Sequence, residues 1–247
     1  FSKLLILRDV NEDNIDKFLN PDIKLDIPNP FKLKDMSKGV DRCLNAIKNE
    51  EKIGIIGDYD VDGSTSVSIL FKFLKNFTSN LICKIPKRLS EGYGPNLRIM
   101  NEMQNEKVKL LFTLDCGTSA YNIIDHPNYK DIDVIVLDHH LSEYKLPNVH
   151  SLINPNRFDE DSEYKDFAAV GVTFLFLMGL RKKIRLLKLF TNIKEPNLMT
   201  YLDLVAVGTV CDIVKIHNYN RSLVKKGIEL IIKRKNKSLS KIIDNSK

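Results

Sequence analysis

The sequence predicts an α/β fold: a doubly wound, mostly parallel sheet forms the first half, and the second half is largely helical. Between about residues 37 and 137, short apolar runs alternate with longer stretches of helical periodicity. This alternation is typical of parallel strands that are covered by helices. Beyond residue 150 the chain contains long apolar segments of helical length instead.

The predicted elements follow each other in a regular order. Four apolar runs have the length of strands: 52–57, 81–85, 109–114 and 133–137. Periodicity predicts helices at 37–49, 64–77, 95–105, 167–180 and 197–207, with a short helix that begins at Ser119. Pro21, Pro28 and Pro30 interrupt residues 1–36, so we expect an irregular lead-in that wraps the core.

Composition limits the class of protein. Mean hydropathy is −0.20 over 247 residues, and no apolar run reaches the 18 or more residues of a membrane span. The chain begins with Phe1 rather than Met, so we expect a segment of a longer protein. The net charge of +6 includes basic clusters at 181–185 and 233–235, which either attract phosphate backbones or form solvated helix surface.

The four cysteines are scattered along the chain, and no two of them form a C-x-x-C pair. This pattern argues against a disulfide framework and against a zinc ribbon. A reducing compartment is the simpler context, so we expect a cytoplasmic protein without a membrane partner.

Three carboxylates, Asp58, Asp60 and Asp62, directly follow the first predicted strand. Three like charges within five residues are unfavourable unless a cation neutralises them, and oxygen ligands suit Mg²⁺, Mn²⁺ or Ca²⁺. An EF-hand fails because Ile69 stands where the loop needs a Glu. A haloacid-dehalogenase-type phosphatase fits poorly because its Thr is displaced, here to Thr65.

Two further motifs follow predicted strands. Asp115-Cys116-Gly117 comes after the third strand, and Asp138-His139-His140 comes after the fourth. Ligands of open α/β sheets bind beyond the carboxyl ends of the strands, so these groups are expected at one edge. Asp212 follows an apolar helix and is either a further ligand or a helix cap.

Four motifs occur in a characteristic order: DYDVDGST at 58–65, LDCG at 114–117, LDHH at 137–140 and GTVCD at 208–212. Together they resemble the DHH phosphoesterase superfamily. Accessory strings resemble its RecJ-like single-stranded-DNA-specific exonucleases: IPKR at 85–88, EGYG at 91–94, INPN at 153–156, AVGV at 169–172 and NRSLV at 220–224. The resemblance covers about residues 34–227. Some superfamily members carry a His at the position of Ile56, and Asp58 is expected to replace it as in RecJ-like proteins.

The resemblance implies hydrolysis of phosphodiester bonds by a 5′ to 3′ exonuclease that releases 5′-mononucleotides from single-stranded DNA, in repair and recombination. It implies two ions, Mn²⁺ or Mg²⁺, with the ligands Asp60, Asp62, Asp115, His139 and Asp212. Asp58 and His140 are assigned to catalysis. His140 is either an outer ligand or a donor to a phosphate oxygen, and we favour the donor because adjacent strand residues point in different directions.

Four residues are assigned to substrate binding: Arg88, Tyr93, Asn154 and Arg221. Arg88 either clamps a backbone phosphate or is a plain surface residue, and Tyr93 either stacks on a base or fills a turn. Asn154 and Arg221 are assigned because they lie in strings that resemble the family. Beyond single-stranded DNA, the implied partners are a single-strand-binding protein and a helicase.

The predicted organisation has three parts. Residues 1–36 form the lead-in, 37–219 form a DHH catalytic domain, and 220–247 begin a connecting helix to a C-terminal domain that the chain lacks. Two other functions stay open: a DHH phosphodiesterase acting on oligoribonucleotides or cyclic dinucleotides, and a degenerate DHH protein that serves as a replication scaffold. The presence of every ligand type argues against the scaffold.

Overall fold

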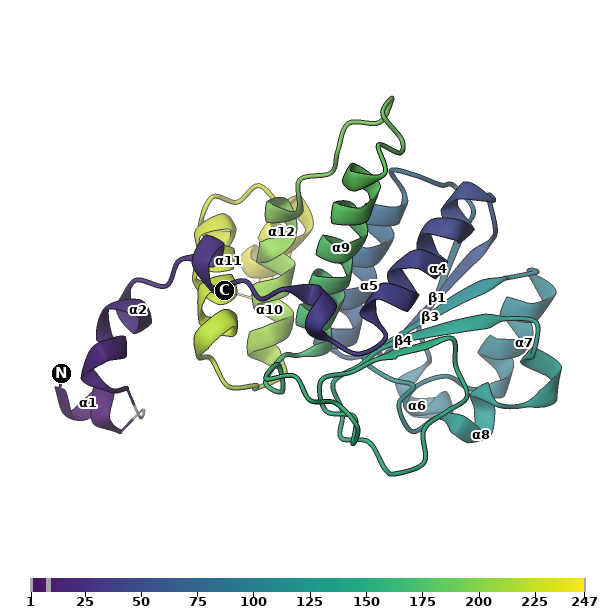
Figure 1. The fold of residues 1–247 in the computed structure, drawn as a ribbon, viewed down its shortest axis with the longest axis horizontal. Coiled ribbons are helices and arrows are strands. Elements are labelled where there is room, and N and C mark those ends of the chain that lie inside the picture. Colours follow the sequence, from purple (N-terminus) through teal and green to yellow (C-terminus); the bar gives the residue numbers. More distant parts are fainter. Residues whose placement is uncertain (1, 8–9, 247) are drawn as a thin grey trace.

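A five-stranded parallel sheet forms the centre of the computed structural model, which describes residues 2–7 and 10–246 (Figure 1). The strand order is β2-β1-β3-β4-β5, and every neighbouring pair is parallel. The strands are β1 Ile53–Gly57, β2 Leu81–Lys84, β3 Leu110–Leu114, β4 Asp133–Leu137 and β5 Ser151–Ile153. The predicted fold class and its four strands are confirmed, whereas β5 was not predicted.

Both faces of the sheet are buried, because successive side chains of each strand enter opposite cores. In β3, Phe112 joins the larger core and its neighbour Leu111 joins the smaller one. The helices α4 Met36–Lys48, α5 Val61–Leu74 and α9 Ala169–Leu186 pack over the larger core. The helices α7 Leu97–Asn105 and α8 Tyr121–Ile124 cover the smaller core on the opposite face. This is the doubly wound arrangement.

The second half adds a helical layer beyond α5 and α9, and the lead-in differs from its prediction. The added helices are α10 Leu202–Cys211, α11 Asn218–Ile232 and α12 Lys237–Asn245. The lead-in carries the short helices α1 Ser2–Ile6, α2 Ile15–Leu19 and α3 Ile23–Asp26, where irregular chain was expected. Within the described residues, no helix is both long enough and apolar enough to cross a membrane.

The register of the sheet places the polar residues that follow its strands in one row. Gly57, Leu114, Leu137 and Ile153 are paired across the sheet as the last residues of β1, β3, β4 and β5. The residues that follow them are Asp58, Asp115, Asp138 and Asn154. Their side chains therefore start from one edge of the sheet, as expected for an open α/β fold.

Candidate metal centre

The acidic segment after β1 turns directly into α5, which begins at Val61, three residues earlier than predicted. The Asp60 side chain accepts a hydrogen bond of 2.8 Å from the N–H of Gly63 and so caps the helix. Asp62, in the first turn, is almost fully buried. Its carboxylate accepts hydrogen bonds from the N–H groups of Ala169 at 2.6 Å and Val170 at 2.8 Å, at the start of α9. The positive end of α9 therefore holds this carboxylate.

Asp115 lies directly after β3 in a left-handed backbone conformation, with φ of 60°. Only 1% of the residue is exposed. The hydroxyl of Tyr93 donates a hydrogen bond of 2.8 Å to the main-chain carbonyl of Asp115. The turn thus fixes the side chain at the sheet edge.

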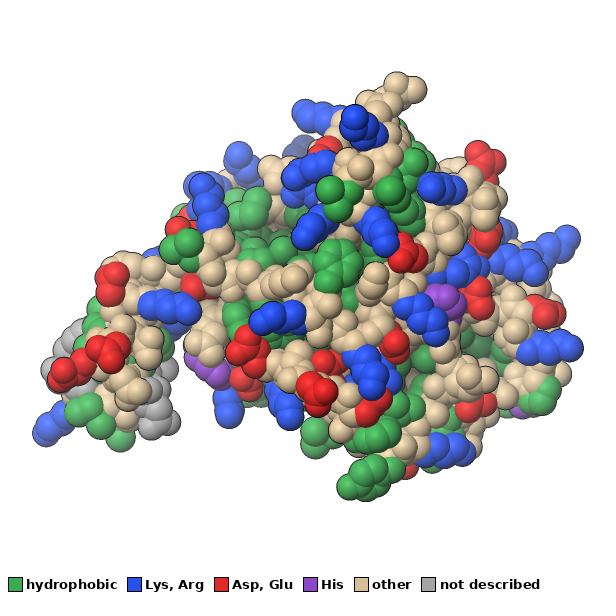
Figure 2. Space-filling model, viewed as in Figure 1, with side chains coloured by type: hydrophobic (Ala, Val, Ile, Leu, Met, Phe, Trp, Pro, Cys, Tyr) green, Lys and Arg blue, Asp and Glu red, His purple; other side chains and the backbone are tan. Residues whose placement is uncertain are grey.

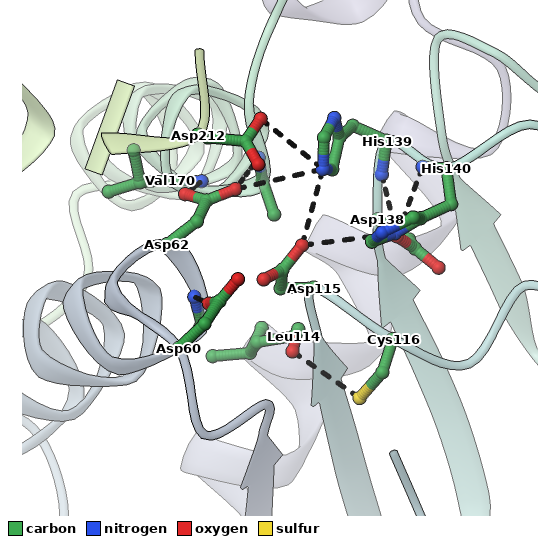
Figure 3. A network of polar contacts seen from close by, with 12 residues as sticks. Asp60, Asp62, Leu114, Asp115, Cys116, Asp138, His139, His140, Val170 and Asp212 are labelled. Carbon is green, nitrogen blue, oxygen red and sulfur yellow. Dashed lines mark hydrogen bonds and ion pairs between the residues drawn. The ribbon is translucent and has the colours of Figure 1, made fainter. Parts of the chain in front are cut away.

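The side chains of four segments converge on one point (Figure 3). His139 Nε2 lies 3.3 Å from Asp115 Oδ1, 3.6 Å from an Asp212 oxygen and 3.8 Å from an Asp62 oxygen. Three overlapping groups of residues each bring their ligand atoms within 4.8 Å of one another. The groups are Asp115 with His139 and His140, Asp62 with His139 and Asp212, and Asp58 with Asp60 and Asp115. All seven residues predicted as ligands or catalytic groups are therefore brought together.

Several polar atoms at this point are buried, and among the described residues they have no hydrogen-bond partner. They are Asp58 Oδ1, Asp115 Oδ1, Asp212 Oδ2 and His139 Nε2. Unpaired buried polar atoms are costly, by about 1–3 kcal/mol each. Burial and the neighbouring carboxylates raise the pKa of Asp115, and burial raises that of Asp212. Divalent cations bound here would satisfy these atoms, and mixed carboxylate and imidazole ligands suit Mn²⁺ or Mg²⁺.

Asp138 is a site residue that the sequence-based assignment missed. It is buried and accepts hydrogen bonds from the N–H groups of Thr118, His139 and His140, and His140 Nδ1 lies 2.7 Å from its Oδ1. Burial alone would raise its pKa, but the hydrogen bonds from His140 and Thr118 lower it to about 2. The hydrogen bond between Asp138 and His140 raises the pKa of His140. Asp138 is the first residue of the DHH string, and this position was the signal that could have identified it.

Two asparagines after β5 hold the main chain of the histidine pair. Asn154 is fully buried, and its amide donates to the Thr118 hydroxyl at 2.8 Å and to the His140 carbonyl at 2.9 Å. The Asn156 amide donates to the His139 carbonyl at 2.6 Å. Asn156 was also missed by the assignment, although it lies in the INPN string.

The other residues assigned to substrate binding lie in different surroundings. Arg88 is exposed, with its guanidinium 5.2 Å from the centre of the Tyr59 ring. Tyr93 is half exposed, and its hydroxyl lies 3.2 Å from His140 Nδ1. Arg221, on α11, contacts the lead-in: its guanidinium lies 3.7 Å above the Phe18 ring, and its Nε donates to the Phe18 carbonyl. The structure thus brings Tyr93 and Asn154 to the metal centre, and it places Arg221 in contact with the lead-in.

The family model described as "DHH family, N-terminal domain" matches residues 52–209, which include the first three motifs and the first two residues of the fourth. The chain belongs to the DHH family. Curated relatives named single-stranded-DNA-specific exonuclease RecJ match it with 34% identity over 201 residues in Haemophilus influenzae and 35% over 202 in Escherichia coli. Each alignment covers 81% of this chain and 35% of the relative. The chain thus spans about a third of the length of these DHH-family relatives.

Solved structures of the family agree with the fold. An exonuclease RecJ bound to manganese superposes with a TM-score of 0.69 at 30% identity, covering 82% of this chain and 48% of the other. RecJ in complex with Mn²⁺ from Thermus thermophilus superposes with a TM-score of 0.68 at 26% identity, and the match covers 91% of this chain and 30% of the other. The resemblance to DHH phosphoesterases that the motifs indicated is confirmed.

Proposed function

We propose that this chain is the catalytic core of a 5′ to 3′ exonuclease that hydrolyses single-stranded DNA to 5′-mononucleotides in repair and recombination. One observation carries the proposal: acidic and histidine side chains from four segments meet, and several of their buried atoms have no hydrogen-bond partner within residues 2–7 and 10–246. Relatives of at least 34% identity named as single-stranded-DNA-specific exonucleases support the choice of substrate.

The ligands we assign are Asp60, Asp62, Asp115, His139 and Asp212, for two Mn²⁺ or Mg²⁺ ions. Ions bound in such a pair supply a water of lowered pKa and neutralise charge on the scissile phosphate. Asp58 shares a ligand group with Asp60 and Asp115, so we assign it to this centre as a catalytic carboxylate.

His140 is the group we assign as donor to a phosphate oxygen. Its Nδ1 is engaged by Asp138 at 2.7 Å, which leaves Nε2 available to the substrate. The Asp138 carboxylate favours the protonated imidazole, which is the form that can donate from Nε2. A positive donor at this position stabilises the charge that develops on the phosphate.

Arg88 is proposed to bind a backbone phosphate, and Tyr93 to border the nucleotide beside His140. We further propose that residues 37–219 are the catalytic domain, 1–36 its lead-in, and 220–247 the start of a connection to a further domain. A cytoplasmic location, with a single-strand-binding protein and a helicase as partners, accords with this function.

The test is digestion of a long single strand labelled at either end, in Mn²⁺, beside a labelled dinucleotide. Early release of labelled mononucleotide from the 5′ end of the long strand supports the proposal. Cleavage of the dinucleotide alone would contradict it and move the chain to the small-substrate phosphodiesterases. Addition of EDTA should stop either reaction.

A further inference from the structure

Two aromatic rings are presented to solvent by the loops next to the histidine pair. Tyr144, in the loop after β4, is 90% exposed, and Phe158, in the loop after β5, is 51% exposed. Their ring centres lie 5.5 Å apart. Figure 2 shows hydrophobic side chains gathered at the lower edge of the molecule, where Figure 1 places the loop after β4. Tyr144 and Phe158 are called the aromatic pair below.

The loops that carry the aromatic pair are held in place. The Ser142 hydroxyl accepts a hydrogen bond of 2.7 Å from the N–H of Phe158, which ties the two loops together. The Lys145 ammonium lies 4.0 Å from the centre of the Tyr121 ring. The N–H of Asn148 donates to Asp125 at 2.8 Å. Tyr144 is therefore displayed by an anchored segment, so little ordering is needed when a ligand binds.

The aromatic pair continues from the metal centre along the surface. A hollow of about 700 Å³ is lined by Tyr93, His140 and the exposed Leu141. A second hollow, of about 750 Å³, is lined by Ser142, which follows Leu141 in the chain, and by the aromatic pair together with Glu143 and Lys145. Tyr144 is four residues from His140, which is at most about 14 Å along an extended chain. The neighbouring nucleotides of a strand whose phosphate lies at His140 would therefore come within reach of Tyr144 and, through it, Phe158.

The size and chemistry of the surface suit bases better than a protein. A stable protein interface buries about 800 Å² on each side, whereas an aromatic side chain contributes about 150–250 Å². Two rings and Leu141 fall short of that area. Exposed rings beside a lysine are, in contrast, the usual means of binding single-stranded nucleic acid, since each base can stack on a ring and the cation attracts phosphate.

We propose that Tyr144 and Phe158 form a stacking platform for bases of the single strand bound at the metal centre. This inference rests on the proposed function, which supplies the single strand as the ligand. The platform acts in binding and not in the chemical step, because neither ring belongs to the groups that meet at His139. It should therefore matter for long strands and be dispensable for a dinucleotide.

The experiment measures binding of the 247-residue chain by fluorescence anisotropy in EDTA, so that no cleavage occurs. One probe is an oligo(dT) of about 20 nucleotides, longer than the site of 4–16 nucleotides expected for a strand-binding groove. The second is an abasic strand of the same length. Tyr144→Ala and Phe158→Ala should each weaken oligo(dT) binding by about fivefold or more, as loss of one stacking ring does. Binding of the abasic strand should be unchanged.

Two variants serve as controls. Tyr144→Phe keeps the ring and should bind oligo(dT) like the wild type. Leu25→Ala removes an apolar side chain of the lead-in that is 84% exposed, and it should have no effect. The melting temperature of each variant shows whether it folds.

Wild-type affinity for oligo(dT) in both alanine variants would overturn the platform and leave the surface to another occupant. An equal loss on the abasic strand would also overturn it, since the contact would then be with the backbone. A wild-type chain that binds oligo(dT) but does not degrade it in Mn²⁺ contradicts only the proposed function. A chain that binds no single strand overturns both.

Discussion

The side-chain amide of Asn156 donates a hydrogen bond of 2.6 Å to the main-chain carbonyl of His139. Asn154 makes the corresponding bond to His140, so the turn after β5 fixes the backbone of both histidines. Histidine ligands depend on such outer contacts for their orientation. The INPN string is therefore best explained as a support for the DHH string.

Asn156→Ala should weaken Mn²⁺ binding and lower kcat, each by about 10–100-fold, because the support of His139 is lost. The free energy of unfolding should fall by only about 1 kcal/mol. Mn²⁺ affinity can be measured by calorimetry on the metal-free protein. Asn148→Ala, at an exposed position in the loop after β4, is the control. Unchanged Mn²⁺ affinity in Asn156→Ala would contradict the supporting role.

Asp115→Asn should reduce hydrolysis by more than about a hundredfold, since even outer contacts of a metal site are worth that much. The metal-free variant should be at least as stable as the wild type, because the neutral amide replaces an acid whose ionisation is opposed by burial and by neighbouring carboxylates. Asn tolerates the left-handed backbone at this position, whereas Asp115→Ala should cost about 1 kcal/mol more. Thermal unfolding and a nuclease assay check both parts. Wild-type turnover in Mn²⁺ would exclude Asp115 as a ligand.

Mn²⁺ should stabilise the protein more at higher pH. Burial and neighbouring carboxylates raise the pKa of Asp62 and Asp115 above the ordinary 3.8. As pH rises above about 4, the unfolded chain loses these protons while the metal-free fold retains them, so stability falls. The ion requires the deprotonated forms and offsets this loss. The increase in Tm on adding Mn²⁺ should thus be larger near pH 8 than near pH 5.5. An increase that shrinks with pH would be contrary to this.

Asp138→Asn should shift the pH dependence of catalysis. The hydrogen bond to the Asp138 carboxylate raises the pKa of His140, so the variant should have a lower imidazole pKa. If the protonated ring donates to phosphate, the fall of kcat at high pH moves to lower pH in the variant. Measuring kcat from about pH 5 to 9 tests this. A variant with reduced kcat and an unmoved profile would assign Asp138 a purely structural role.

Arg88→Ala should weaken the binding of all single strands regardless of sequence. Loss of one phosphate contact lowers the slope of log affinity against log salt by about 0.7 for single strands. Anisotropy titrations at several salt concentrations measure the slope. Arg98 forms ion pairs with Glu91 and Glu102. Arg98→Ala is therefore the matched control, and it should leave the slope unchanged. An unchanged slope in Arg88→Ala would remove Arg88 from the phosphate contacts.

The sequence predicted β1, β3 and β4 well because charged residues lie at or next to both ends of their apolar runs. β4 was placed at its observed ends, Asp133 and Leu137. The three-residue β5 was missed, since Leu152 and Ile153 alone are too short to show a period. The start of α5 was placed late because Asp60 was considered only as a ligand, whereas its side chain also caps the helix.

The sequence predicted the residues that could hold the metal, but it did not predict the residues that hold those side chains in position. Most of the assigned ligands are recognised by residue type and by their position after strands, Asp212 follows a helix instead, and all of them meet in the structure. Asp138 accepts a hydrogen bond from the N–H of Thr118, and Asn156 donates one to the carbonyl of His139. Both contacts join different segments, so they depend on the register of the sheet. No local pattern in one sequence encodes that register.

The hydrogen bonds from Ala169 and Val170 to Asp62 have a consequence for the growing chain. The sheet strands and the first acidic motif are synthesised well before α9 and Asp212. Until those later segments dock, Asp62 lacks its donors and one ligand is absent. A partly made or truncated chain would therefore carry an incomplete metal centre, and the proposed hydrolysis would begin only once both halves of the fold are assembled.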